Sequence, residues 1–257
     1  MIPVRQSTAP AVREARCGSR PGIRAQTPPT AVLNGESSRL LDHVHDPGVE
    51  LIIWERRLPS GLGDWLDRLS IAHLPRGHFL VDEGEPRAAF AWMLDASSTP
   101  DDDMRALLLT DLAEVTSRFA SLMRAKRVEV RLEAVHHDAC WKFHRDCVAA
   151  RLLTTYRGPG TEWVSPGDSA QALARQKSYG GPIHRFPRHA VGLFKGSCAA
   201  PASGIVHRSP PIAGTGTTRL LFCLNLPSSI SPLPWAQQTT MGVSPTGRRS
   251  TRTRSRG

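Results

Sequence analysis

Short apolar runs separated by glycine, proline and serine clusters fill the second half of the chain, and they restrict the fold more than any other feature of the sequence. Runs of this length and spacing are typical of strands in an all-β sandwich or an open barrel. With 21 Gly and 21 Pro among 257 residues, collagen, a coiled coil and a long helical bundle are excluded. The clearest runs are VEVRLEAV (128–135), VAARLLTTY (148–156), HAVGLFKG (189–196), GIVHR (204–208) and TRLLFCLNL (218–226).

The segments before these runs predict helices that cover one face of the β-structure. Residues 49–58 favour a strand and residues 61–72 a short helix. A long helix is expected over residues 100–127, because apolar side chains recur there every three to four positions between an acidic start and a basic end. The sequence therefore predicts the α+β class, with helices packed against an outer face of the β-structure.

Composition shifts at both ends limit the expected ordered part to a single domain over residues 36–226. Residues 1–35 combine five prolines with no sustained apolar period, which predicts a disordered leader. The leader is also rich in arginine, as transit peptides are, but its prolines would break the amphipathic helix that such a peptide needs. Residues 227–257 change from Pro/Ser-rich to Arg-rich, which predicts a disordered basic tail.

The net charge of +10 comes from the two ends of the chain. Residues 1–40 hold six Arg and two Glu, residues 227–257 hold five Arg and no acid, and the remainder is nearly neutral with 22 basic and 21 acidic residues. A nucleic-acid module would carry its positive charge on the folded surface. Specific nucleic-acid binding is therefore not expected, and the partner we expect is a small-molecule or peptide substrate.

Cysteine usage and hydropathy indicate the compartment. No apolar run is long enough to span a membrane, and no signal peptide is recognisable. The five cysteines contain no C-x-x-C pair, which disfavours a disulfide framework or a cysteine-rich zinc finger. We expect a cytoplasmic protein whose cysteines are buried free thiols.

A candidate metal site begins with His144 and Asp146, an H-x-D pair that leads into the strand at 148–156. On a strand, residues i and i+2 point to the same face, so this imidazole and this carboxylate can reach one ion. His207, on a later strand, would complete a two-His-one-carboxylate triad of the kind that binds non-haem iron. Arg219 follows on the next strand.

These residues resemble the iron(II)/2-oxoglutarate dioxygenases of the prolyl-hydroxylase type over about residues 136–226. The resemblance implies a double-stranded β-helix of the jelly-roll or cupin kind, with Fe(II) held by the triad. It further implies that Arg219, helped by Tyr156, holds the distal carboxylate of 2-oxoglutarate. The run HRDCVAARLLTTYRGPGTEWV carries the matching residues His144, Asp146, Arg151, Tyr156, Gly160, Thr161 and Trp163, and HRSPPIAGTGTTRLL carries His207, Pro210, Gly214 and Arg219.

The middle of the chain is also similar to a bacterial family of unknown function whose genes often neighbour zinc-homeostasis genes. The similarity rests on the runs WKFHRD, YGGPIHRFP and GIVHRSPP. An alternative to the oxygenase is therefore a non-catalytic zinc-binding or zinc-homeostasis protein, because zinc prefers closed N/S ligand sets. Softer ligands for zinc surround the H-x-D pair, namely His136, His137, Cys140 and Cys147. A third possibility is a degenerate β-helix that only binds a partner.

Overall fold

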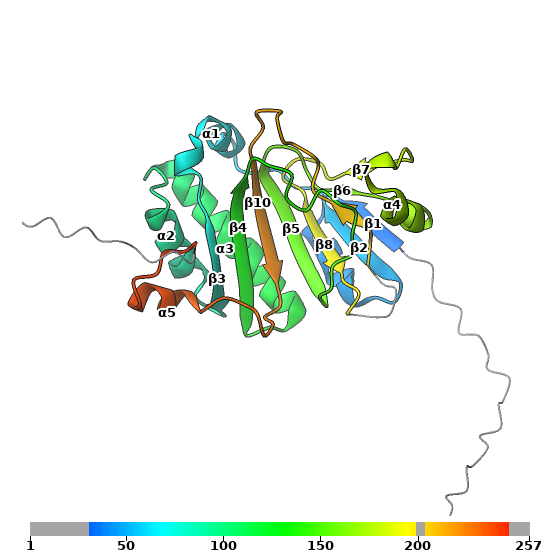
Figure 1. Ribbon diagram of the computed structural model, residues 1–257. Helices are drawn as coiled ribbons and strands as arrows, with labels where there is room; N and C mark the ends of the chain where they lie inside the picture. Colours follow the sequence, from blue (N-terminus) through cyan, green and yellow to red (C-terminus); the bar gives the residue numbers. More distant parts are fainter. Residues whose placement is uncertain (1–30, 199–203, 247–257) are drawn as a thin grey trace, which may run out of the picture.

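The computed structural model describes residues 31–198 and 204–246, which form two β-sheets and a layer of helices (Figure 1). The large sheet has seven strands in the order β1-β2-β8-β5-β10-β4-β3 and is antiparallel except for the β1-β2 pair. The small sheet has the order β7-β6-β9. The large-sheet strands are β1 (Ala31–Gly35), β2 (Val49–Trp54), β3 (Gly77–Asp82), β4 (Arg127–Val135), β5 (Ala150–Arg157), β8 (Val191–Lys195) and β10 (Arg219–Asn225). The small-sheet strands are β6 (Glu162–Trp163), β7 (His184–Arg185) and β9 (His207–Arg208).

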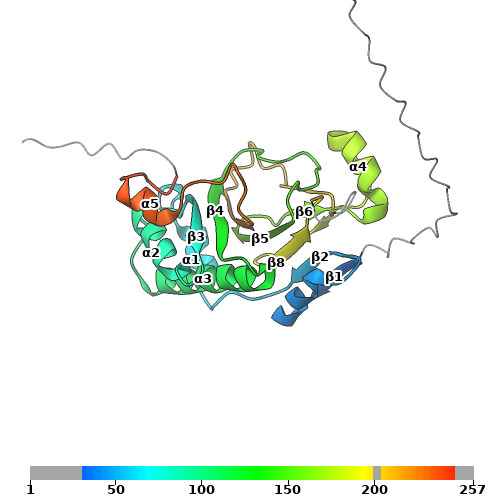
Figure 2. The same ribbon diagram turned by 90° about the horizontal axis from the view of Figure 1, so that it is seen from below.

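Three α-helices cover one face of the large sheet, as Figure 2 shows from below: α1 (Leu62–Arg68), α2 (Pro86–Ala96) and α3 (Asp103–Met123). The N-cap of the long helix α3 is Asp102, whose side chain accepts a hydrogen bond from the backbone N–H of Arg105 at 2.9 Å. It ends at Arg124 in the left-handed conformation. The predicted long helix is confirmed within narrower bounds. The helices α1, α2 and α3 lie on one side of a largely antiparallel sheet, in agreement with the predicted α+β class.

Strand alternation divides the side chains of the large sheet between two environments. On β10, Leu220 and Phe222 point to the helices and join the main core, while Arg219 and Cys223 point to the opposite face. That second face carries its own apolar cluster, which includes Leu51, Ile53, Leu153 and Phe194. Both faces of the sheet are therefore buried over its central strands.

The small sheet and the helix α4 (Ser169–Arg175) lie over this second face (Figures 1 and 2). Phe186, which follows β7, packs against β8 at Gly192. A Cβ atom at Gly192 would lie 2.1 Å from the Phe186 ring, so only glycine lets the two segments approach this closely. Phe143, Val164 and Val206 close the far side of the small sheet against α4.

Both predicted domain boundaries need correction. Residues 31–35 of the expected leader form β1, which pairs with β2 along the whole length of the strand. The expected tail contains α5 (Trp235–Thr240), and its backbone covers the edge of β3: the Leu80 N–H donates to Leu233 O and the His78 N–H to Pro245 O. These bonds occupy an otherwise open strand edge, which explains how a segment poor in apolar residues becomes ordered. The rest of both tails, residues 1–30 and 247–257, lies outside the described residues.

In the part of the chain that the structure describes, no helix is long and apolar enough to cross a membrane.

Candidate metal centre

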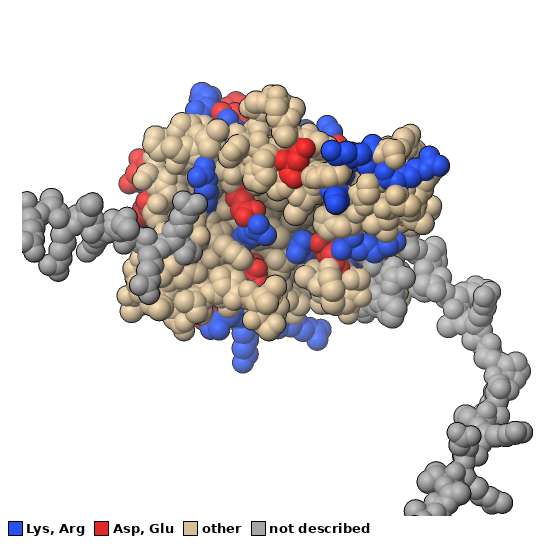
Figure 3. All heavy atoms as spheres, viewed as in Figure 1, with Lys and Arg blue, Asp and Glu red and all other residues tan. Residues whose placement is uncertain are grey.

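A cavity of about 110 Å³ lies on the face of the large sheet opposite α3. Figure 3 views this side of the molecule, where acidic and basic side chains lie next to one another in the middle of the surface. Side chains of the central strands form the floor of the cavity, and β9 and the segment after β4 form its wall. The lining residues are Arg131, Glu133, Val135, Ala139, Cys140, His144, Arg151, Leu153, Thr161, His207, Ser209, Arg219, Leu221, Cys223 and Asn225.

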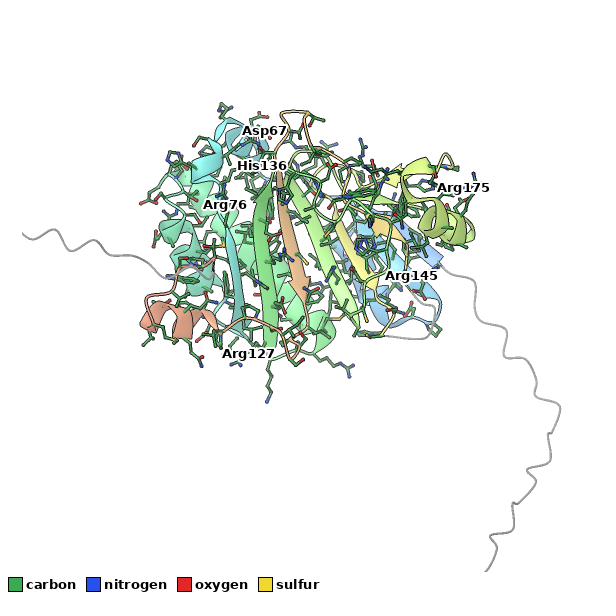
Figure 4. All side chains as sticks on the ribbon, in the orientation of Figure 1. Asp67, Arg76, Arg127, His136, Arg145 and Arg175 are labelled. Atoms are coloured by element: carbon green, nitrogen blue, oxygen red, sulfur yellow. The ribbon has the colours of Figure 1, made fainter. Side chains whose placement is uncertain are left out.

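The two histidines of the predicted triad face each other across an antiparallel bridge. The His144 N–H donates to His207 O and the His207 N–H donates to His144 O, both at 3.0 Å. Residues that exchange both backbone bonds project their side chains to the same side, and the two ring centroids are 4.6 Å apart. Arg145 points elsewhere and donates from Nε to Gly204 O at 3.0 Å (Figure 4). Alternation along the segment thus directs His144 and Asp146 together, as the H-x-D spacing predicted.

Asp146 lies between the imidazoles and is buried. His207 Nε2 is 3.4 Å from Asp146 Oδ2, and His144 Nε2 is 3.7 Å from Asp146 Oδ1. Arg151 donates from Nη1 to Oδ1. Among the described residues Oδ2 has no hydrogen-bond partner, although it is fully buried. Burial of a carboxylate oxygen without a hydrogen-bond partner costs free energy. A bound cation or a proton at Oδ2 would offset this cost.

Backbone carbonyls fix the tautomers of both imidazoles. His144 Nδ1 lies 2.8 Å from Lys142 O, and His207 Nδ1 lies 3.0 Å from Ile205 O. A carbonyl only accepts, so each Nδ1 must donate, and in the neutral ring the Nε2 lone pair is left to face Asp146. Burial lowers the pKa of His207 despite the opposing pull of Asp146, which keeps this imidazole neutral.

One nitrogen from each imidazole and one carboxylate oxygen lie within 4.8 Å of one another, and within the described ranges this is the group of His, Cys, Asp and Glu side chains that could hold a metal ion. Two ligands about 2.1 Å from one ion lie at most about 4.2 Å apart, so the three atoms need only a small adjustment to bind one ion. Two imidazole Nε2 atoms, a carboxylate whose Oδ2 has no partner among the described residues, and hydrogen bonds that orient the rings all fit a divalent cation. The structure brings the three side chains together, and their role as ligands stays a prediction.

Arg219 lies in the same cavity and is only 2% exposed. Its Nε donates to Pro159 O at 2.8 Å and its Nη1 to Ser209 Oγ at 2.7 Å. Nη2 makes longer bonds of 3.3 and 3.4 Å to the hydroxyls of Thr155 and Thr161. Every one of these acceptors is neutral, and burial lowers the pKa of Arg219 to about 10. The cavity therefore presents a desolvated positive charge that a carboxylate would stabilise.

The position of Tyr156 corrects its expected role in cosubstrate binding. Its ring is fully buried in the core on the helix side of the sheet. Its hydroxyl donates to Asp111 of α3, and Arg56 donates to the same carboxylate. Tyr156 is five residues after Arg151 on one strand, and an odd spacing directs two side chains to opposite faces. It therefore holds the sheet to α3 and does not line the cavity.

The softer zinc ligands are not gathered with the triad. Of His136, His137, Cys140 and Cys147, only Cys140 lines the cavity. None of the four belongs to the metal-binding group found among the described residues. His136 follows the upper end of β4 in Figure 4. The expectation of buried thiols is confirmed for Cys223 and wrong for Cys140, Cys147 and Cys198, which are exposed. Cys17 lies outside the described residues.

Arg151 and Asn225 support the carboxylate in a way that sequence reasoning missed. Arg151 joins Asp146 to Asn225, because its Nε donates to Asn225 Oδ1 at 2.8 Å while Nη1 donates to the carboxylate. This contact occupies Oδ1 and leaves Oδ2 free. Arg151 belongs to the run HRDCVAARLLTTYRGPGTEWV that carries the family resemblance. It lies two residues before Leu153 on β5, so strand alternation places both side chains on the face that lines the cavity.

A family model described as "Protein of unknown function (DUF1826)" matches residues 35–225. The chain belongs to this family. The match spans all but one strand of the large sheet and all three triad residues of this DUF1826 domain. No curated protein matches the sequence.

Solved structures similar to this DUF1826 chain include an alpha-KG complex and a prolyl-4-hydroxylase. The alpha-KG complex is that of a full-length Neurospora crassa protein, which is 13% identical and has a TM-score of 0.35, with 68% of this chain and 73% of that chain covered. AviO1 from Streptomyces viridochromogenes Tue57 is 14% identical with a TM-score of 0.30, covering 68% and 98%. The Pseudomonas putida prolyl-4-hydroxylase is 10% identical with a TM-score of 0.30, covering 65% and 94%. Scores this low do not establish a shared fold, so any function must be argued from the chain's own residues.

Proposed function

We propose that this DUF1826 protein is an iron(II)- and 2-oxoglutarate-dependent oxygenase whose two sheets form a double-stranded β-helix. The observation that carries the proposal is the convergence of His144, Asp146 and His207, which brings both imidazoles to the carboxylate with the unpartnered Oδ2. The substrate is a small molecule or a peptide.

The donor set favours iron among the divalent metals. Two imidazoles and one carboxylate bind a ferrous ion on one side and leave its other positions open, whereas structural zinc prefers a closed set of four nitrogen and sulfur ligands. Ferrous iron with 2-oxoglutarate would supply oxygen activation at such a site. The side chain of Arg151 keeps the Asp146 carboxylate in place, and the carbonyls of Lys142 and Ile205 keep the rings oriented.

Arg219 supports 2-oxoglutarate as the anion. Its guanidinium lines the same cavity as His144 and His207, and none of the hydrogen bonds described above joins it to a protein carboxylate. Nη1 retains a second N–H, and the long Nη2 bonds to threonine hydroxyls are weak. A carboxylate can therefore take two parallel hydrogen bonds from Nη1 and Nη2. Leu153 and Leu221 supply apolar wall that limits water in the cavity.

Metal analysis of triad variants tests the proposal. Protein purified without oxygen and loaded with Fe(II) should hold one equivalent per chain, and Asp146→Asn and His207→Gln should each lose it. His136→Gln is the matched control, because this histidine belongs to the same segment but not to the metal-binding group. Full metal retention by both triad variants would refute the site. A tightly held zinc that ignores 2-oxoglutarate would instead favour the zinc-binding alternative.

A further inference from the structure

Two exposed cysteines lie side by side at the open end of the β5-β8 pair. The sulfur atoms of Cys147 and Cys198 are 3.7 Å apart, although the residues are far apart in the sequence. Both side chains are exposed to solvent, so a soluble oxidant can reach them. The metal centre described above uses neither sulfur.

The strand register places the two residues opposite each other. β5 pairs with β8 so that Ala150 faces Lys195, and three further steps in this register set Cys147 against Cys198. Beyond the strands the backbone bonds depart from this register by one residue, because the Gly196 N–H donates in register to Ala149 O at 3.1 Å, whereas the Cys198 N–H donates to Val148 O at 3.2 Å. The side chains nevertheless meet, because the two sulfur atoms are 3.7 Å apart, against about 2.05 Å in a disulfide. Side-chain rotation with a small backbone adjustment can bring the sulfurs into bonding distance.

We propose that Cys147 and Cys198 form a reversible disulfide by thiol–disulfide exchange with a small-molecule disulfide. With glutathione disulfide, one cysteine thiolate attacks a glutathione sulfur and releases one glutathione. The second cysteine then attacks the mixed disulfide and releases the other. The two thiols lose two electrons and two protons in total, and the oxidant is reduced to two molecules of glutathione.

The bridge fastens the segment that carries Asp146. Ser197, next to Cys198, donates from its N–H and its hydroxyl to the backbone oxygen of Asp146, at 2.8 and 3.1 Å. The disulfide adds a covalent link one residue away from each end of this contact. It thereby couples the redox state of surrounding thiols to the anchoring of the buried Asp146, whether or not the site binds iron.

Peptide mapping of the full chain tests the bridge. The metal-free protein is equilibrated in buffers of reduced and oxidised glutathione, its free thiols are alkylated, and tryptic peptides are analysed by mass spectrometry. Cleavage after Arg145, Arg151, Lys195 and Arg208 separates the two cysteines from the others. We expect one cross-linked species that joins residues 146–151 to residues 196–208 and disappears on reduction with dithiothreitol.

Single substitutions separate this bridge from other thiol chemistry. Cys147→Ser and Cys198→Ser should each abolish the cross-link, while Cys140→Ser and Cys223→Ser, as matched controls, should retain it. A wild-type protein that gives only stable glutathione adducts, or that links either cysteine to a different partner, would overturn the proposal. Because no metal is present, none of these outcomes depends on the proposed oxygenase activity.

Discussion

Replacement of Arg219 tests the anion site most sharply. Arg219 is 2% exposed, and the acceptors of its guanidinium in the described structure are a carbonyl and three hydroxyls, so a bound carboxylate would be its first negatively charged hydrogen-bond partner. Truncation of one member of a buried, hydrogen-bonded charge pair costs about 2–5 kcal/mol. Arg219→Ala should therefore weaken 2-oxoglutarate binding by about 30- to 4,000-fold, since about 1.4 kcal/mol is tenfold.

Isothermal titration of 2-oxoglutarate into anaerobic, Fe(II)-loaded protein measures this loss. Arg219→Lys should recover only part of the affinity, because an ammonium keeps the charge but not the planar pair of donors. Arg157→Ala is the control, because Arg157 also donates to a backbone carbonyl, Leu69 O at 2.8 Å, but is not among the residues that line the cavity. Unchanged 2-oxoglutarate affinity in Arg219→Ala, with iron still bound, would refute the anion role of this residue.

Three further predictions rest on individual contacts. Tyr156→Phe should lower the free energy of unfolding by about 1–3 kcal/mol, because Asp111 loses a buried donor, and this loss is measured by urea denaturation. The affinity for 2-oxoglutarate, measured by titration, should stay unchanged. Weaker 2-oxoglutarate binding by the variant would return Tyr156 to the cosubstrate site. Gln238→Ala should destabilise the protein by about 1–3 kcal/mol, because its buried amide donates to His78 O of β3 and to Leu233 O of the segment that covers this strand. The exposed neighbour is the control, and Gln237→Ala should change stability by less than about 0.5 kcal/mol in thermal unfolding. The lowered folded-state pKa of His207 means that, below the ordinary value of 6.5, the unfolded chain binds a proton that the folded chain does not. The metal-free protein should therefore lose up to about 1.4 kcal/mol of stability per pH unit from this group as the pH falls below 6.5, and His207→Gln should flatten that slope in urea titrations at pH 7.5 and 5.5. If the stability of His207→Gln fell with pH as steeply as that of the wild type, the lowered pKa of His207 would be contradicted.

Periodicity predicted the long elements and missed the short ones. The strands β4 and β10 and the helix α3 are each long enough to show a repeating apolar pattern in the sequence. Two-residue strands such as β6 and β7 have no such pattern, and the 227–246 segment is ordered by backbone bonds to β3 that composition does not encode. The central strands of the large sheet could therefore be predicted from local sequence. The segment at the β3 edge and the strands of the small sheet could not, because they form through tertiary contacts.

The candidate site was predictable where it depends on spacing along one extended segment, although the structure places His144 in an isolated bridge and starts β5 only at Ala150. The i, i+2 relation of His144 and Asp146 is a local property, and it correctly placed both side chains on one side. The same rule, applied to Arg151 and Tyr156, would have excluded the tyrosine from the cavity. In contrast, the acceptors of Arg219 come from Pro159, Ser209 and two threonines on separate segments, and no sequence pattern joins them.

The most direct test of the oxygenase proposal is the visible absorption spectrum of the anaerobic, Fe(II)-loaded protein as 2-oxoglutarate is added. We predict a metal-to-ligand charge-transfer band that grows to saturation at one 2-oxoglutarate per iron, and that is absent from His207→Gln. Chelation of a ferrous ion by 2-oxoglutarate requires the open positions that a two-His-one-carboxylate site provides. Wild-type protein that holds one Fe(II) per chain yet shows no such band at saturating 2-oxoglutarate would contradict the proposed function.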